Sequence, residues 1–160
     1  MPVITFSTTI KAPIERCFDL ARSINFHMHS MRATGELAVE GVVSGLIGPG
    51  QEVTREARHL GRTRTLTSRI CDFDRPRVFA DEMVKGDFAS FRHEHRFEVL
   101  GPNSTRLNDR FEYHAPFGLL GRTAEAVFLT GYMRRLLQGH AERLRLALES
   151  GAWREWLEPR

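Results

Sequence analysis

The sequence has little cysteine, little lysine and no long run of apolar residues. Its two cysteines, Cys17 and Cys71, are far apart and lie among apolar residues, so we expect two buried free thiols and no disulfide scaffold. No apolar run approaches the roughly 20 residues of a membrane-spanning helix, so no membrane span is expected. The first residues lack the basic and apolar regions of a signal peptide, which favours a cytoplasmic protein.

Almost all of the positive charge is arginine, because Lys11 and Lys85 are the only lysines among 23 basic residues. A nucleic-acid groove needs a one-sided basic stripe with aromatic residues between the charges. The arginines of the first half are instead interrupted by Glu52, Glu56 and several threonines. We therefore expect no nucleic-acid partner and interpret them as the solvated face of strands: Arg55, Arg58, Arg62, Arg64 and Arg69.

Motifs for phosphates and nucleotides are also missing. The sequence contains no P-loop, no dinucleotide fingerprint and no nucleophile elbow, so we expect no cofactor. The glycine-rich segment 41–50 lacks the lysine of a phosphate loop and is interpreted as a flexible connection between strands.

The residues that are present are typical of a globular domain. The chain has 160 residues, of which 41% are hydrophobic and 27% charged, and this length fits a single core. We predict one domain over residues 1–150, followed by a tail at 151–160. Trp153 and Trp156 make this tail apolar. It either packs back on the domain or forms a homodimer or partner contact.

The hydrophobic period changes twice along the chain. Residues 3–10 predict a strand, and Pro13 and the N-cap residue Ser23 precede two short helices over 14–21 and 24–31. From about residue 35 to 114 the period is two, which predicts six strands in an antiparallel meander. Their spans are near 37–39, 52–60, 64–73, 78–84, 88–100 and 105–114.

The last element is a helix of about 27 residues, roughly 40 Å long at 1.5 Å per residue, between residues 123 and 150. Its apolar stripe needs a partner, and the sheet is the only large one. The sequence therefore predicts an α+β fold in which a curved seven-stranded antiparallel sheet wraps around a long C-terminal helix. The stripe contains Val127, Leu129, Met133, Leu136, Leu137, His140, Leu144 and Ala147 or Leu148.

Two neighbouring strands place polar side chains on their buried faces. In the strand 88–100, the alternate residues Phe91, His93, His95, Phe97 and Val99 share the inner face. In the strand 105–114, the inner face holds Leu107, Asp109, Phe111 and Tyr113. Matching the two faces across the turn at Pro102 requires a bulge or an odd loop, and either register brings Asp109 close to His95. Because a buried carboxylate without a partner is costly, we expect a His–Asp hydrogen bond.

Three interpretations of this inner cluster stay open: a structural network, the polar lining of a ligand cavity, and a metal site. His93-x-His95 would place two imidazoles on one face, but Glu98 falls on the opposite face and no second His motif follows, so no metal is predicted. For catalysis, His95 oriented by Asp109 would be the general base, with His93 or Tyr113 as the acid. The candidate ligand-binding residues are Phe91, His93, His95, Phe97, Asp109, Phe111, Tyr113, Leu129, Met133 and Leu136.

The order of several short motifs resembles the START-like, or SRPBCC, helix-grip superfamily, and above all its bacterial branch of cyclase/dehydrase-like and cell-division-inhibitor-like proteins. The resemblance covers about residues 3–148. It rests on Thr8-Thr9-Ile10-x-Ala12-Pro13, Gly45-Leu46-Ile47, Phe79-x-Asp81-x-Met83, Gly86-x-Phe88, His93-x-His95-x-Phe97, Asp109, Tyr113, Pro116-x-Gly118 and Gly121.

This resemblance implies a deep hydrophobic cavity between the sheet and the C-terminal helix. Members of the superfamily bind lipids, sterols, polyketides or aromatic compounds, and some are enzymes. The expected partner is therefore a small hydrophobic ligand. The alternative is a cyclase or dehydratase that uses His93, His95, Asp109 and Tyr113 as general acid and base.

Overall fold

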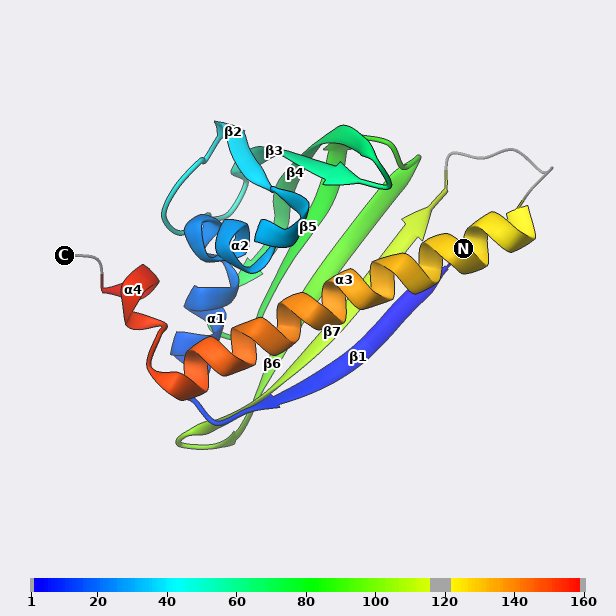
Figure 1. The fold of residues 1–160 in the computed structure, drawn as a ribbon. Helices are drawn as coiled ribbons and strands as arrows, with labels where there is room; N and C mark the ends of the chain where they lie inside the picture. Colours follow the sequence, from blue (N-terminus) through cyan, green and yellow to red (C-terminus); the bar gives the residue numbers. More distant parts are fainter. Residues whose placement is uncertain (1, 116–121, 159–160) are drawn as a thin grey trace.

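The computed structural model describes residues 2–115 and 122–158, in which a single seven-stranded antiparallel sheet curves around a long helix (Figure 1). The strands lie in the order β1-β7-β6-β5-β4-β3-β2. Only β1 leaves the meander, because it pairs with the last strand. The strands are β1 (Val3–Ile10), β2 (Leu37–Gly41), β3 (Glu52–His59), β4 (Arg62–Asp74), β5 (Val78–Lys85), β6 (Ser90–Gly101) and β7 (Ser104–His114).

The described helices confirm the predicted order of elements. They are α1 (Ile14–Ala21), α2 (Ile24–Ser30), the 3-10 turn η1 (Arg32–Thr34), α3 (Arg122–Ser150) and α4 (Arg154–Leu157). The hydroxyl of Ser23 accepts a hydrogen bond of 3.1 Å from the backbone N–H of Phe26, so it caps α2 as its sequence position predicts. Pro116, Gly118 and Gly121, which contribute to the family resemblance, lie outside the described residues.

The alternation predicted for β6 and β7 is confirmed except at Val99, which was expected on the inner face but is 63% exposed, because it lies at the irregular end of β6. His95 lies opposite Asp109 and Phe91 opposite Tyr113 in the register of β6 and β7, and the register shifts between Val99 and Gly101. This shift is the bulge that matching the two inner faces requires.

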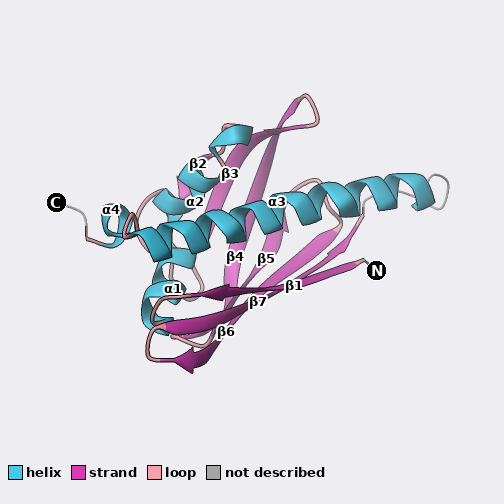
Figure 2. Cartoon of the chain, turned by 60° about the horizontal axis from the view of Figure 1, so that its bottom comes forward, coloured by secondary structure: helices cyan, strands magenta, loops and turns pink. Residues whose placement is uncertain are grey.

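The α3 helix divides into two parts along its length (Figures 1 and 2). Its C-terminal part packs against α1 and the sheet, and Leu144, Ala147 and Leu148 are buried there. Its N-terminal end extends past the strands in both views. Val127 is therefore 71% exposed, and its assignment to the apolar stripe is wrong.

A dense aromatic core closes the end of the sheet beneath α1. The ring of Phe18 packs against the rings of Phe73, Phe79 and Phe97 at centroid distances of 5.2–5.4 Å. Trp153 is 8% exposed, and Trp156 packs edge-on against Phe26. The tail thus packs on the body of the protein, and the alternative of a dimer contact gains no support from the described residues.

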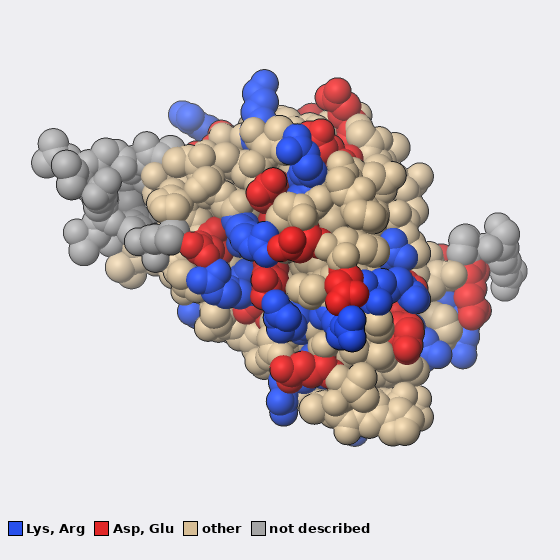
Figure 3. Space-filling view, turned by 180° about the vertical axis from the view of Figure 1, so that it is seen from behind, with Lys and Arg blue, Asp and Glu red and all other residues tan. Residues whose placement is uncertain are grey.

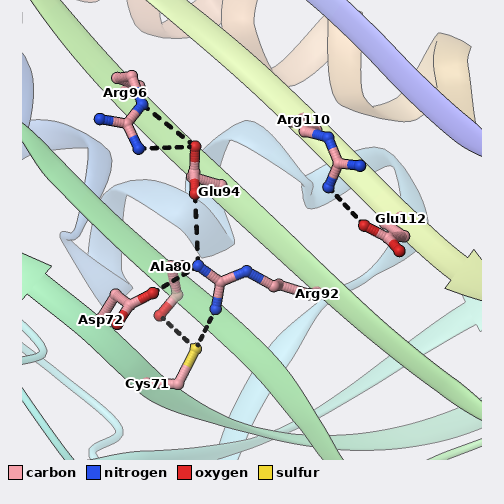
Figure 4. Close-up of polar contacts among 8 residues, drawn as sticks. All are labelled: Cys71, Asp72, Ala80, Arg92, Glu94, Arg96, Arg110 and Glu112. Carbon is pink, nitrogen blue, oxygen red and sulfur yellow. Dashed lines mark hydrogen bonds and ion pairs between the residues drawn. The ribbon is translucent and has the colours of Figure 1, made fainter.

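Charged side chains of both signs cover the outer face of the sheet (Figure 3). Arg92 bonds Asp72 and Glu94, and Arg96 also bonds Glu94 (Figure 4). Cys71 is half-buried on this face and donates to the carbonyl of Ala80 at 3.5 Å, so only Cys17 is fully buried as expected. No helix within the described residues is long and apolar enough to cross a membrane.

Candidate functional site

A cavity of about 580 Å³ lies between the inner face of the sheet and α3. The exposed residues Leu60 and Arg62 form part of its wall, so it opens to solvent beside the β3–β4 turn. Most of the wall is apolar: phenylalanine rings come from the sheet and from the β5–β6 connection, and α3 contributes mainly aliphatic chains. The main apolar residues are Phe79, Phe88, Phe91, Phe111, Leu129, Met133, Leu136 and Leu137.

Histidines are concentrated around this cavity. Five of the seven histidines of the chain line it, although they come from distant parts of the sequence, on α2, β3, β6 and α3. A mostly apolar cavity with a few convergent polar groups is the usual form of a small-molecule site. The five are His27, His59, His93, His95 and His140.

Asp109 holds two of these imidazoles with a single oxygen. Its Oδ1 lies 3.0 Å from Nε2 of His93 and 2.9 Å from Nδ1 of His95. Since a carboxylate only accepts, Nε2 of His93 donates to it, which sets the tautomer of that ring, and Nδ1 of His95 forms an ion pair with the same oxygen. Oδ2 of Asp109 is buried and has no hydrogen-bond partner in residues 2–115 and 122–158, so all of its stabilisation comes through Oδ1.

A second carboxylate approaches His95 from β5. Asp81 lies opposite His93 in the β5–β6 register, and its Oδ1 is 3.8 Å from Nε2 of His95. Phe79, two residues earlier on the same face, stacks on the His95 ring at a centroid distance of 4.5 Å. The His95 ring is thus fixed by a stacked aromatic ring and by a carboxylate at each of its nitrogens.

These contacts shift the pKa values of His93 and His95 in opposite directions. Burial alone would lower the pKa of His95, but the close contact with Asp109 and the negative charges of Asp109 and Asp81 outweigh it and raise the pKa to about 9. For His93, burial and the adjacent charge of His95 dominate, and its pKa falls below the ordinary value. For Asp109, burial is outweighed by the two histidines, and its pKa lies well below its usual range. At neutral pH the cluster therefore holds a charged His95 beside a neutral His93.

A second polar group on the cavity wall contains Glu36, His27 and Arg55. Glu36 is only 7% exposed, and its carboxylate bonds Nδ1 of His27 and lies 3.6 Å from Nε of Arg55. Burial would raise the pKa of Glu36, but the contacts with His27 and Arg55 lower it. Arg55 was predicted on the solvent face. That prediction is wrong, because Arg55 lines the cavity with a side chain that is 17% exposed.

The remaining two histidines are bonded to hydroxyl groups. Nδ1 of His140 lies 2.5 Å from Oγ of Ser30, and burial pushes the pKa of His140 well below its ordinary value, so its ring is neutral. Nδ1 of His59 lies 2.7 Å from the hydroxyl of Tyr132 on α3. This contact joins the β3–β4 hairpin to the helix across the opening.

Three of the predicted site residues lie outside the cavity wall, and the others line it. Phe97 belongs to the aromatic core beneath α1, outside the cavity wall. Tyr113 is fully buried outside the wall, and its hydroxyl lies 2.7 Å from Oγ1 of Thr130. Asp109 lies behind the two histidines that it orients. The other predicted residues line the cavity together: Phe91, His93, His95, Phe111, Leu129, Met133 and Leu136.

Sequence reasoning missed Asp81, Glu36 and three of the cavity histidines. A signal for Asp81 is present, because Phe79, Asp81 and Met83 alternate along β5 as the inner residues of β6 do. Glu36 lies in the connection between η1 and β2, where no periodicity shows that its side chain points inward.

Solved structures of low sequence identity share this fold. Protein TTHA0849 from Thermus thermophilus is 19% identical, with a TM-score of 0.69 over 91% of this chain and 99% of the other. The ZhuI aromatase/cyclase from Streptomyces sp. R1128 is 18% identical, with a TM-score of 0.60 over 98% and 94%. Norcoclaurine synthase from Thalictrum flavum, solved with dopamine and hydroxybenzaldehyde, is 12% identical, with a TM-score of 0.61 over 89% and 86%.

These likenesses define the class of fold: a START-like helix-grip protein, in which a curved sheet and a C-terminal helix enclose a cavity. Comparison of the sequence with known families gives a narrower assignment than the fold does. Residues 1–149 match the family described as polyketide cyclase/dehydrase and lipid transport, and the chain belongs to this family. No curated protein matches the sequence.

Proposed function

We propose that the protein binds one small hydrophobic ligand, such as a lipid, a polyketide or an aromatic compound, in the cavity between its sheet and α3. The observation that carries the proposal is the cavity itself, about 580 Å³ in volume and lined by Phe88, Phe91 and Phe111 on one side and by aliphatic residues of α3 on the other. This volume lies within the range of about 300–1,000 Å³ of sites that take small molecules. The family description, which includes lipid transport, supports the same proposal.

A cavity-filling substitution tests this proposal. Leu136 lines the cavity, whereas Leu146 on the same helix is 52% exposed and does not line it. Leu136→Trp should weaken binding of the fluorescent probe 8-anilinonaphthalene-1-sulfonate at least tenfold, and Leu146→Trp should leave it unchanged. The measurement is a fluorescence titration of each variant, with circular dichroism to check the fold. Equal binding by the two variants, or no saturable binding by the wild type, would contradict the proposal.

A second candidate function is acid–base catalysis on such a ligand, for example an aldol cyclisation followed by loss of water. The observation that favours it is the pairing of a neutral His93 with a charged His95 in one apolar cavity. In this scheme His93 removes a proton from the carbon between two carbonyl groups, the carbanion attacks a third carbonyl carbon, and His95 protonates the oxygen formed. These roles reverse the assignment of His95 as the base, and Tyr113 has no part in them.

The catalytic candidate predicts a separation of binding from turnover. His93→Gln should abolish conversion of a short poly-β-ketone thioester, followed by the absorbance of the aromatic product, and should keep binding of the fluorescent probe. His114→Gln, at an exposed histidine outside the cavity wall, is the matched control. Absence of turnover by the wild type on poly-β-ketones of several lengths would count against catalysis and leave ligand binding standing.

A further inference from the structure

Three side chains of the cavity wall converge on one point. Asp81, His93 and His95 each offer a ligand atom, and these three atoms lie within 4.8 Å of one another. Atoms that coordinate one first-row metal ion at about 2.0–2.2 Å are separated by roughly 3–4.5 Å. The distance of 3.8 Å between Oδ1 of Asp81 and Nε2 of His95 falls in this range and is too long for a direct hydrogen bond.

The orientation of the two imidazoles also fits coordination of a metal ion. Nε2 of His93 and Nδ1 of His95 both face Oδ1 of Asp109, which leaves Nδ1 of His93 and Nε2 of His95 for a metal ion, and binding of the ion releases the proton that Nε2 of His95 carries at neutral pH. Histidines that bind metals almost always donate their other ring N–H to a carboxylate or carbonyl, which fixes the ring and increases its basicity. Asp109 occupies this position for both rings at once.

The three side chains also lie where a small molecule could reach them. Asp81, His93 and His95 all line the cavity, so the side of the cluster away from Asp109 faces its interior. Asp109 and Asp81 bring two carboxylates to two imidazoles, a set that compensates the charge of a dication. Two imidazoles and one carboxylate with free positions are typical of catalytic zinc and non-haem iron sites.

We propose that Asp81, His93 and His95 form a binding site for a divalent first-row transition metal ion on the cavity wall, with Asp109 as the positioning residue of both histidines. The free coordination positions face the space assigned to the hydrophobic ligand. A ligand that carries a carbonyl, hydroxyl or carboxylate group can then reach the ion with that oxygen.

Titration of the chelator-treated, full-length protein with Co²⁺ tests the site. The wild type should bind one equivalent and develop the visible absorption bands of a nitrogen- and oxygen-ligated Co²⁺. Asp81→Asn and His93→Gln should weaken binding at least tenfold and remove these bands. Asp109→Asn should weaken binding about 10- to 100-fold while the bands persist at saturation, since it orients the ligands without coordinating.

His114→Gln serves as the matched control, because His114 is exposed and lies outside the cavity wall, and it should bind Co²⁺ as the wild type does. The proposal is overturned if the wild type gives no such bands, or if the control loses binding as strongly as the ligand variants. Binding of 8-anilinonaphthalene-1-sulfonate to the metal-free protein is measured in parallel. It reports on the hydrophobic cavity alone, so failure of the metal site and failure of the proposed ligand binding are distinguishable.

Discussion

A single oxygen of Asp109 contacts the imidazole rings of both His93 and His95. His93 and His95 are two residues apart on β6 and both are at least nine-tenths buried, yet the pKa of one falls and that of the other rises. The difference arises from the surrounding charges: two carboxylates, Asp109 and Asp81, raise the pKa of His95, whereas the positive charge of His95 adds to burial in lowering the pKa of His93. Two histidines of equal burial thus have opposite protonation states at neutral pH.

Glu36 gives a prediction for stability against pH. Glu36→Gln keeps the shape of the side chain and removes its charge, so at neutral pH it should lower the free energy of unfolding by about 1–3 kcal/mol. The folded state holds the pKa of Glu36 below the ordinary value of 4.5, through His27 and Arg55 against the opposing effect of burial. The contribution of its charge is therefore present above pH 4.5 and is lost as the pH falls through the lower, folded pKa.

Urea unfolding of the wild type and of Glu36→Gln at a series of pH values from about 3 to 7 measures this effect. The gap between the two proteins should be widest near neutral pH and should shrink in acid. A constant gap across the series would mean that the amide loses packing or hydrogen-bond geometry rather than charge. Glu40→Gln, at an exposed position of β2, provides the control.

Single side chains were predicted well only where they lie in a long alternating strand. The inward positions of His93, His95 and Asp109 follow from the period of two, since each strand has one buried face. Arg55 shows where this reasoning fails. Arg55 alternates with the buried Val53 and Ala57 on the inner face of β3, but its charge led to the interpretation as solvated, because its partner Glu36 comes from an irregular segment that no pattern places.

At the scale of elements, the two parts of α3 should respond differently to the same substitution. Leu144 is 1% exposed in the packed core, so Leu144→Ala should lower the free energy of unfolding by about 2–5 kcal/mol. Leu136 is half-buried and faces the cavity, so Leu136→Ala removes fewer contacts and should cost about 1 kcal/mol. Equilibrium urea unfolding compares the two variants, and equal losses would be inconsistent with a helix that is packed at only one end.

The bounds of the elements were predicted within a few residues, because prolines, glycines and turn sequences mark their ends. α2 ends at Ser30 and β3 at His59, each one residue before the predicted end. The start of α3 was also predicted within one residue, but the burial of its first turns was not. Val127 continues the apolar pattern of the sequence and is nevertheless 71% exposed.

For the molecule as a whole, ligand binding should appear as a gain in thermal stability. A ligand present at about 100 times its dissociation constant stabilises the folded state by about 2.7 kcal/mol. In a domain of this size that gain raises the Tm by about 5–10 °C. Thermal unfolding with a panel of fatty acids, sterols and aromatic polyketides should identify ligands that shift the wild type by this amount. Leu136→Trp should lose the shift, and an equal shift in both proteins would place the binding elsewhere.

The fold could be predicted from the sequence because the pattern of the strands and the length of the helix fit each other. Seven amphipathic strands need one apolar partner, and α3 is long enough to supply it. The size and the lining of the cavity could not be predicted from the sequence. They depend on how far the N-terminal part of α3 stands from the sheet, and this distance is set by residues such as His59 and Tyr132, which meet only in the folded chain.

The pairing of the first strand with the last has a consequence for the order of folding. Ser7 lies beside Asn108, so β1 has no neighbour until β7 has emerged from the ribosome. The strands from β2 to β6 can pair as successive hairpins, whereas β1 stays unpaired during this time. Contacts between such distant parts of the chain slow the search for the native state. Closure of the sheet along this seam should therefore be a late kinetic step, and a nascent chain that stops before Ser104 should keep β1 accessible to chaperones.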